Sequence, residues 1–120
     1  MLTILERSDT ILLVLSPEYA LVKSAFDAIE IFDRMGFDAE KVIPMVNDIF
    51  PSQHMPLNKI SQVLGNRTLL EIPYDSSSII QAINTGKPIM MTSPKSEVCQ
   101  VILSLASKFS SKELSLHKKT

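Results

Sequence analysis

The stretch that decides the fold is TILLVLSPEY, residues 10–19, in which five apolar residues end at a serine and a proline. A continuous apolar run of this length is typical of a strand covered on both faces of a sheet. Two further runs follow the same plan: VIPMV, residues 42–46, ends at Asn47-Asp48, and LLEI, residues 69–72, ends at Pro73-Tyr74-Asp75. We therefore predict three strands, each followed by polar or turn-forming residues.

Segments with helical spacing separate the three runs. Apolar residues between 21 and 35 recur every three or four positions, and Gly36 supplies a stop. Further helices are expected over 57–64, over 79–83 behind the N-capping residues 75–78, and from Ser93-Pro94 to Phe109. Connections of this length favour parallel strands with right-handed crossovers. The predicted fold class is α/β, with three adjacent parallel strands and helices on both faces, in three α/β/α layers.

The first two predicted strands differ in how they are expected to pair. Pro44 lies inside the second run and cannot donate a hydrogen bond to a neighbouring strand, so pairing is expected to begin only after it. The run from Ile11 to Leu15 contains neither proline nor charge. An open edge there would pair readily with another chain, unless residues 1–8 fold back over it.

Length and composition limit the class of protein. At 120 residues the chain is at most one domain, with residues 1–109 as the domain and residues 110–120 as a polar tail. A net charge of −1 without a basic face argues against nucleic acid as a partner. No apolar run reaches membrane-spanning length, and no secretory signal is recognisable. We therefore expect a cytoplasmic protein without direct membrane insertion.

The residues that follow the strands are the candidate binding residues, because open α/β sheets bind ligands at the carboxyl ends of their strands. The Asn47 amide can donate to and accept from the edge of a base, although such an asparagine more often forms a local turn. Pro73 would hold a carbonyl rigidly beyond the third strand, where it could meet an exocyclic amine, although it is more simply a loop proline. Asp75 could touch a ligand or orient this loop, and it is also a natural N-cap for the next helix. Ser16-Pro17 is more simply a strand terminator.

The histidines and the cysteine do not predict a metal site. His54 and His117 are far apart in sequence, and Cys99 is the single cysteine, so paired ligand spacing is missing and an internal disulfide is excluded. Cys99 has no motif around it and is expected to be buried or half-buried in a helix.

The charged residues do not predict a catalytic site either. Lys87 stands between a glycine and a proline, but the backbone nest and the Ser/Thr of a phosphate loop are missing there. Three carboxylates are expected to form a solvated helical face rather than an acid–base pair: Asp27, Glu30 and Asp33. We therefore identify no catalytic residue.

The order and spacing of five segments resemble the C-terminal half of the MinD/ParA-type P-loop ATPases, most of all the CpaE-like branch associated with pilus assembly and polar localisation. The segments are SDTILLVLSPEYALVKSAFDAIEIFDRMGF (8–37), PMVND (44–48), LLEIPYD (69–75), AINTGKPIM (82–90) and SPKSEV (93–98). The resemblance extends over residues 2–109. It implies a partial P-loop NTPase domain of Rossmann-like type.

The resemblance implies ATP as the cofactor and assigns roles at its base. In that family the asparagine after the middle strand and the proline after the next strand contact adenine, and these match Asn47 and Pro73. The aspartate of the family's IPxD pattern matches Asp75 and shapes the same loop. Family members usually carry arginine where this chain has Asp48, which removes a positive charge beside the nucleotide.

The family's phosphate loop, magnesium-binding aspartate and switch would all precede Met1. Phosphoryl transfer depends on these groups, so hydrolysis by this chain alone is not expected, and Mg²⁺ would bind only with the missing N-terminal half. The chain would be a fragment, a truncated reading frame or one half of a split protein. Its expected partners are an adenine nucleotide and either that half or a second copy. The alternative function is a protein-interaction or dimerisation module that pairs through Ile11 to Leu15.

Overall fold

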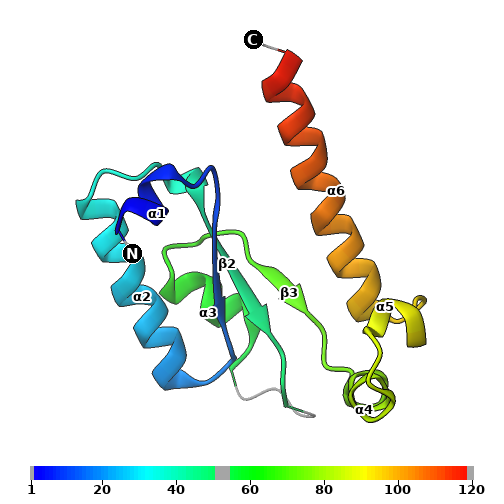
Figure 1. The fold of residues 1–120 in the computed structure, drawn as a ribbon. Coiled ribbons are helices and arrows are strands. Elements are labelled where there is room, and N and C mark those ends of the chain that lie inside the picture. Colours follow the sequence, from blue (N-terminus) through cyan, green and yellow to red (C-terminus); the bar gives the residue numbers. More distant parts are fainter. Residues whose placement is uncertain (1, 51–54, 119–120) are drawn as a thin grey trace. The chain divides into compact units, whose positions relative to one another are not determined.

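The computed structural model describes residues 2–50 and 55–118, with side chains for residues 3–50 and 55–110. It divides into two compact units, Met1–Glu71 (unit 1) and Ile72–Thr120 (unit 2). The elements of unit 1 are α1 (Leu2–Arg7), β1 (Ile11–Leu15), α2 (Tyr19–Arg34), a 3₁₀ turn (Ala39–Lys41), β2 (Val42–Asn47) and α3 (Leu57–Val63). The strand β3 (Leu70–Ile72) spans the boundary, and unit 2 continues with α4 (Ser76–Thr85), α5 (Ile89–Thr92) and α6 (Glu97–Lys118) (Figure 1).

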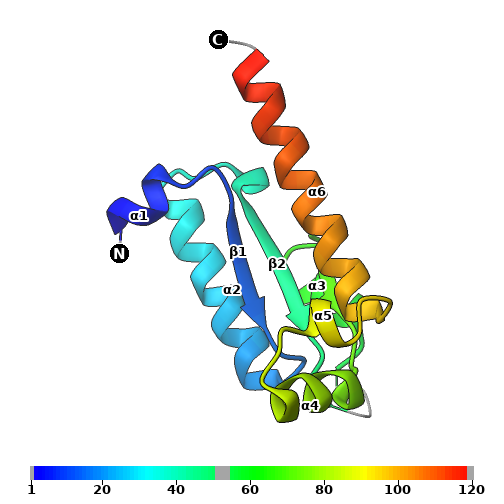
Figure 2. The same ribbon diagram turned by 45° about the vertical axis from the view of Figure 1, so that its right-hand side comes forward.

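The three strands form one open parallel sheet in the order β1-β2-β3, as predicted. β1 pairs with β2 in parallel register, from Ile11 opposite Val42 to Leu15 opposite Val46. Figure 2 shows these two strands side by side and ending at the same edge. The sequence boundaries of β1 and β2 were therefore predicted correctly, and β3 is one residue shorter than the run 69–72.

The expectation that pairing begins after Pro44 is wrong. β2 begins at Val42, and Pro44 is paired in register with Leu13 in the middle of the strand. Alternate residues of a strand direct their backbone groups to opposite neighbours, so the missing N–H of Pro44 removes only one hydrogen bond of the sheet. Its ring is fully buried, which offsets part of that loss.

The core of unit 1 lies between the sheet and the helices α2 and α3. Successive residues of a strand point to opposite faces, and β1 and β2 send alternate apolar residues to this side. On α2 the buried residues are Val22, Ala25 and Ile29, which recur at helical spacing along one face. The whole cluster is Leu15, Val22, Ala25, Ile29, Val42, Val46, Ile60 and Leu64. On the other face of β1, the side chain of Val14 is 55% exposed.

Glycines end the helices where the sequence predicts. Gly36 follows α2 with φ +84°, and the N–H of Phe37 reaches back to the carbonyl of Phe32 at 3.1 Å. Gly86 follows α4 with φ +67°, and the N–H of Lys87 reaches the carbonyl of Ala82 at 3.2 Å. Residues other than glycine rarely adopt this left-handed conformation, so these positions fix the ends of the helices.

Unit 2 contains two features that the sequence did not predict. The single-turn helix α5 follows Pro88, in a segment for which no helix was predicted. The helix α6 begins at Glu97, three residues after Ser93-Pro94, and its backbone continues to Lys118, through most of the segment expected as a polar tail.

Two cations tie together the amino-terminal edge of the sheet. The Arg67 guanidinium donates to the carbonyls of Ala39 at 2.9 Å and Val42 at 3.3 Å, and it lies 3.5 Å from the Asp33 carboxylate. The Lys41 ammonium donates to the carbonyl of Glu6 at 3.1 Å, which attaches α1 to this edge. At the opposite, carboxyl-terminal ends of the strands of unit 1, β2 ends at the candidate binding residue Asn47.

Candidate nucleotide-binding residues

Asn47 is the last residue of β2 and is half-buried. The next residue, Asp48, forms a local turn, because its Oδ1 accepts a hydrogen bond from the N–H of Phe50 at 3.3 Å. The local turn was the alternative for Asn47, but the side chain that forms it is that of Asp48. Within residues 2–50 and 55–118, the Asn47 side chain makes no hydrogen bond, so its amide is available to a ligand or to water.

Pro73 follows β3 directly and is half-buried, while Asp75 is the N-cap of α4. The Asp75 Oδ1 accepts hydrogen bonds from the Ser78 N–H at 3.2 Å and from the Ser77 hydroxyl at 3.3 Å. These bonds, first of all the one from the Ser78 backbone, lower the pKa of Asp75 below its ordinary value because they favour the carboxylate. The predicted capping role of Asp75 is confirmed. Its carboxylate is already engaged in holding the loop between β3 and α4.

Asn47 belongs to unit 1, and Asp75 and Pro73 belong to unit 2. The structure thus describes the two halves of the candidate site separately. Their convergence on one ligand is a proposal, for which the strand order β1-β2-β3 is the basis.

Ser16-Pro17 ends β1, as predicted. Ser16 and Pro17 are both buried, the Ser16 hydroxyl donates to Glu18 Oε2 at 3.0 Å, and α2 begins at Tyr19. This geometry turns the chain sharply from the strand into the helix. It leaves little of Ser16 or Pro17 exposed to a ligand.

The remaining candidates keep their simpler interpretations where the structure describes them. Cys99 is fully buried in α6, as expected. His54 lies outside the described residues, and only the backbone of His117 is described. Among the described residues no group of three or more His, Cys, Asp or Glu side chains is placed to hold a metal ion.

The three carboxylates of α2 are exposed to solvent, as predicted. Asp33 has a further role, since it is the ion-pair partner of Arg67. Lys87 is also exposed, and its backbone N–H closes the end of α4. None of these residues is arranged as an acid–base pair or a phosphate loop.

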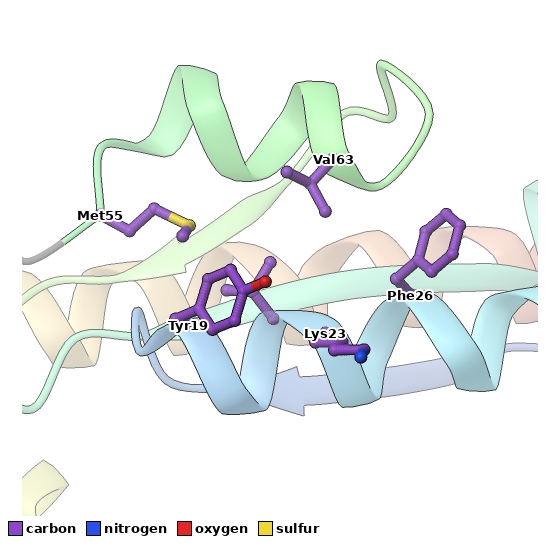
Figure 3. A pocket seen from close by; sticks show the side chains of 6 residues that line it. Tyr19, Lys23, Phe26, Met55 and Val63 are labelled. Atoms are coloured by element: carbon purple, nitrogen blue, oxygen red, sulfur yellow. The ribbon is translucent and has the colours of Figure 1, made fainter.

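A groove that the sequence did not predict lies between α2 and α3 in unit 1. Its volume is about 220 Å³, and Figure 3 shows the side chains around it. The lining residues are Tyr19, Val22, Lys23, Phe26, Met55 and Val63. The sequence held one indication of this groove, the spacing of Tyr19, Lys23 and Phe26. Positions i, i+4 and i+7 lie on one side of a helix, so these three side chains could be expected to line a common surface. The groove is mainly apolar and has no acid–base pair.

One comparison with known proteins supports the fold. A solved structure of a ParA family ATPase from Chlorobium tepidum TLS superposes with a TM-score of 0.73 at 19% sequence identity, covering 86% of this chain. The chain has a ParA-type fold. It spans 43% of the length of that structure. No protein-family model and no curated protein matches the sequence. None of the described helices is long and apolar enough to cross a membrane.

Proposed function

We propose that the chain is part of a ParA/MinD-like ATPase domain and carries the adenine-binding edge of its nucleotide site. The observation that supports this most is the ParA-type fold over 86% of the chain. In such a sheet β2 and β3 are neighbours, and Asn47 and Pro73 stand at their carboxyl ends. Ligands of open α/β sheets bind at this edge. The finer assignment, to the CpaE-like branch and to pilus assembly, rests on the sequence resemblance.

Asn47 and Pro73 supply the proposed contacts to the base, and Asp75 positions them. The amide of Asn47 carries both a donor and an acceptor, which suits the mixed donors and acceptors of adenine. Pro73 restricts the backbone that would present a carbonyl to the exocyclic amine. Asp75 holds this backbone through Ser77 and Ser78, so it acts on the loop rather than on the base.

Phosphate binding and hydrolysis are not assigned to these 120 residues. Their only glycines are Gly36, Gly65 and Gly86, so no glycine-rich phosphate loop is present in the sequence. In the proposed intact site an N-terminal half would bind the phosphates and Mg²⁺. The chain alone should therefore show no ATP turnover above a no-protein control; turnover that a substitution within the chain abolishes would contradict this proposal.

Chemical-shift mapping with adenosine, ATP and guanosine tests the adenine edge. Without phosphate contacts the base must offset several kcal/mol of association cost, so we expect a dissociation constant of about 1 mM or weaker. Adenosine and ATP should change the amide chemical shifts of Asn47, of the residues on either side of Pro73, and of Asp75. Guanosine should change these chemical shifts less. Shifts centred on Lys87 or on the α2–α3 groove would contradict the assignment.

A pair of asparagine variants makes this test specific. Asn47→Ala should weaken the shifts caused by adenosine several-fold, because it removes both hydrogen-bonding groups. Asn84→Ala is the matched control, since Asn84 is an exposed asparagine on α4 without a side-chain hydrogen bond among the described residues. Equal behaviour of the two variants would exclude Asn47 from the site.

The second candidate function is pairing with another protein chain through β1. The observation that favours it is the position of β1 at the end of the strand order, with β2 as its only strand neighbour among the described residues. In the part of the chain that the structure describes, no strand pairs with the outer edge of β1, and Ile11–Leu15 contains neither proline nor charge. Sedimentation velocity of the chain tests pairing with a second copy: a single monomeric species at all concentrations would exclude self-association through β1.

A further inference from the structure

We propose that the groove between α2 and α3 is a docking site for an acidic amphipathic helix of another protein. The proposal goes beyond the adenine edge, and it depends neither on a bound nucleotide nor on the outer edge of β1. All residues that line the groove belong to unit 1. Three features carry the proposal: the apolar lining of the groove, its size, and two lysines at its rim.

The lining of the groove presents apolar side chains that unit 1 buries only in part. Figure 3 shows Tyr19 and Phe26 along α2, with Met55 and Val63 on the opposite wall. The exposed fractions are 75% for Tyr19, 41% for Val63 and 37% for Phe26. Aromatic residues and methionine are enriched where proteins bind one another, and the flexible methionine adapts its shape to a partner. The lining therefore has the composition of a protein-binding surface.

The size of the groove suits anchoring side chains better than a free small molecule. Its volume of about 220 Å³ is smaller than the about 300–1,000 Å³ of pockets that enclose a drug-sized ligand. From Tyr19 to Phe26 the groove follows about 10 Å of helix, at about 1.5 Å per residue. Apolar side chains at positions i, i+4 and i+7 of a partner helix span the same length, and such helices commonly dock in apolar grooves.

Lys23 places a positive charge at the α2 side of the groove. At about 100° per residue, Phe26 is turned by about 40° from the buried Val22, and Lys23 by about 100° in the same direction. Lys23 therefore stands at the outer rim, beyond the apolar lining. Its methylene stem lines the groove, as lysine stems often do on apolar surfaces, while the ammonium group stays in water.

Lys59 takes the corresponding position on α3. Relative to the fully buried Ile60, Val63 is turned by about 60° and Lys59 by about 100° in the same direction. Because Val63 lines the groove, the exposed Lys59 stands at its outer side. Each helix thus presents, from the core outward, a buried residue, an apolar lining residue and a lysine.

The two ammonium groups favour carboxylates on the occupant. Within residues 3–50 and 55–110, neither Lys23 nor Lys59 has an ion pair or a side-chain hydrogen bond. No acidic residue lines the groove. Of the carboxylates on α2, Glu30 follows Phe26 by one turn, and Asp27 is turned further from the core than Lys23. The groove is therefore cationic at the end where α2 and α3 begin, and a complementary helix carries its acidic residues there.

Charge and shape also argue against two other occupants. The chain's own segment 110–120 contains three lysines, at positions 112, 118 and 119, and one acidic residue, Glu113, so Lys23 and Lys59 would repel it. An anionic membrane has the complementary charge, but its surface is flat, whereas the apolar side chains here line a hollow.

Three fluorescent peptides test the proposal on the full chain without nucleotide. Each is a helix-forming peptide of about 14 residues with apolar anchors at i, i+4 and i+7, and the three differ only in carrying glutamate, glutamine or lysine beside the anchors. Fluorescence anisotropy should give a dissociation constant of about 10–100 μM for the glutamate peptide. The glutamine peptide should bind several-fold more weakly and the lysine peptide at least tenfold more weakly. Equal affinities, or no binding of the glutamate peptide at about 1 mM, would overturn the proposal.

Charge reversal locates the peptide on the chain. Lys23→Glu should weaken binding of the glutamate peptide at least tenfold and strengthen binding of the lysine peptide, because the rim changes sign. Lys87→Glu is the matched control, since Lys87 is an exposed lysine outside the groove, and it should change both affinities less than about twofold. Equal effects of the two variants would place the peptide elsewhere and contradict the proposal.

The apolar lining is tested by Val63→Gln, which keeps a good helix former in α3 while it removes apolar surface. This variant should weaken the glutamate peptide about fivefold or more, whereas Ile83→Gln, at an exposed isoleucine of α4, should not. Circular dichroism checks that both variants fold, and Lys23→Glu remains the test if Val63→Gln does not. An unchanged affinity in folded Val63→Gln would contradict docking in the groove.

Vesicles of phosphatidylglycerol and phosphatidylcholine form the last arm of the test. The chain should not bind them in a flotation assay, because the groove is proposed to enclose a helix. Vesicle binding that Lys23→Glu abolishes, together with no binding of the glutamate peptide, would identify a membrane as the occupant and overturn the proposal.

Discussion

Unit 1 and unit 2 differ in how many of their apolar side chains are buried. In unit 1 a continuous cluster fills the space between sheet and helices, with Val22, Val46 and Ile60 no more than 1% exposed. In unit 2 the buried apolar residues among those described are Val98 and Cys99. Both units leave large apolar side chains more than half exposed, in unit 2 Ile80, Ile83, Met91 and Leu103, so the units differ in their buried cores. The comparison teaches that the hydrophobic free energy of folding is concentrated in the buried cluster of unit 1.

The largest expected effect comes from truncating isoleucines in the two units. Ile60→Ala should lower the free energy of unfolding by about 2–5 kcal/mol, because it opens a cavity in the core of unit 1. Ile83→Ala, at a side chain that is 72% exposed, should change it by less than about 0.5 kcal/mol. Urea denaturation followed by circular dichroism measures both. Similar losses for the two variants would break the comparison.

A smaller effect is expected at the amino-terminal edge of unit 1. Arg67→Met should lower the free energy of unfolding by about 1–3 kcal/mol, because two backbone carbonyls lose a charged donor. Asp33→Asn should cost less than about 1 kcal/mol, since the Asp33 carboxylate is 57% exposed and the ion pair is screened. The same urea experiment separates them. A loss from Asp33→Asn that matches Arg67→Met would assign the effect to the ion pair instead of the carbonyls.

The smallest effect concerns the N-cap of α4 in unit 2. The lowered pKa of Asp75 means that its carboxylate stabilises the folded state above the ordinary value of about 3.8. This contribution is lost as the pH falls through the lower, folded-state pKa. Asp75→Asn keeps a capping oxygen without a titrating group, so its α4 should show no such pH dependence. Carboxyl NMR titration of Asp75 should give a midpoint below 3.8; a midpoint at or above that value would refute the capping explanation.

Much of the fold could be predicted because its signals are local. The apolar run of β1, the helical spacing of α2 and the glycine after it each act within a few residues, and all three were located correctly. The capping role of Asp75 was predictable for the same reason. Pro44 was misjudged because the loss of one hydrogen bond was weighed without the burial of its ring, which depends on the packing of the whole unit.

The features that the sequence did not predict depend on distant residues. Arg67 bonds to Ala39 and Val42, 28 and 25 positions earlier in the chain, and no local pattern marks such a contact. The groove requires Met55 and Val63 to meet α2, which follows from the sheet order rather than from their own sequence. The adenine-binding roles of Asn47 and Pro73 stay predictions.

The cations at the amino-terminal edge of the sheet restrict how the length of the chain can vary. Lys41 donates a hydrogen bond to the carbonyl of Glu6, and Arg67 donates to the carbonyls of Ala39 and Val42. Each bond joins residues that are distant in sequence, so the lengths of the segments between them must match. A residue inserted at 37–41 or 66–69 would shift a donor and its carbonyl by more than the few tenths of an ångström that a hydrogen bond tolerates. We therefore expect insertions at this edge, including inserted reporter domains, to destabilise the fold, even though surface loops generally accept insertions at little cost.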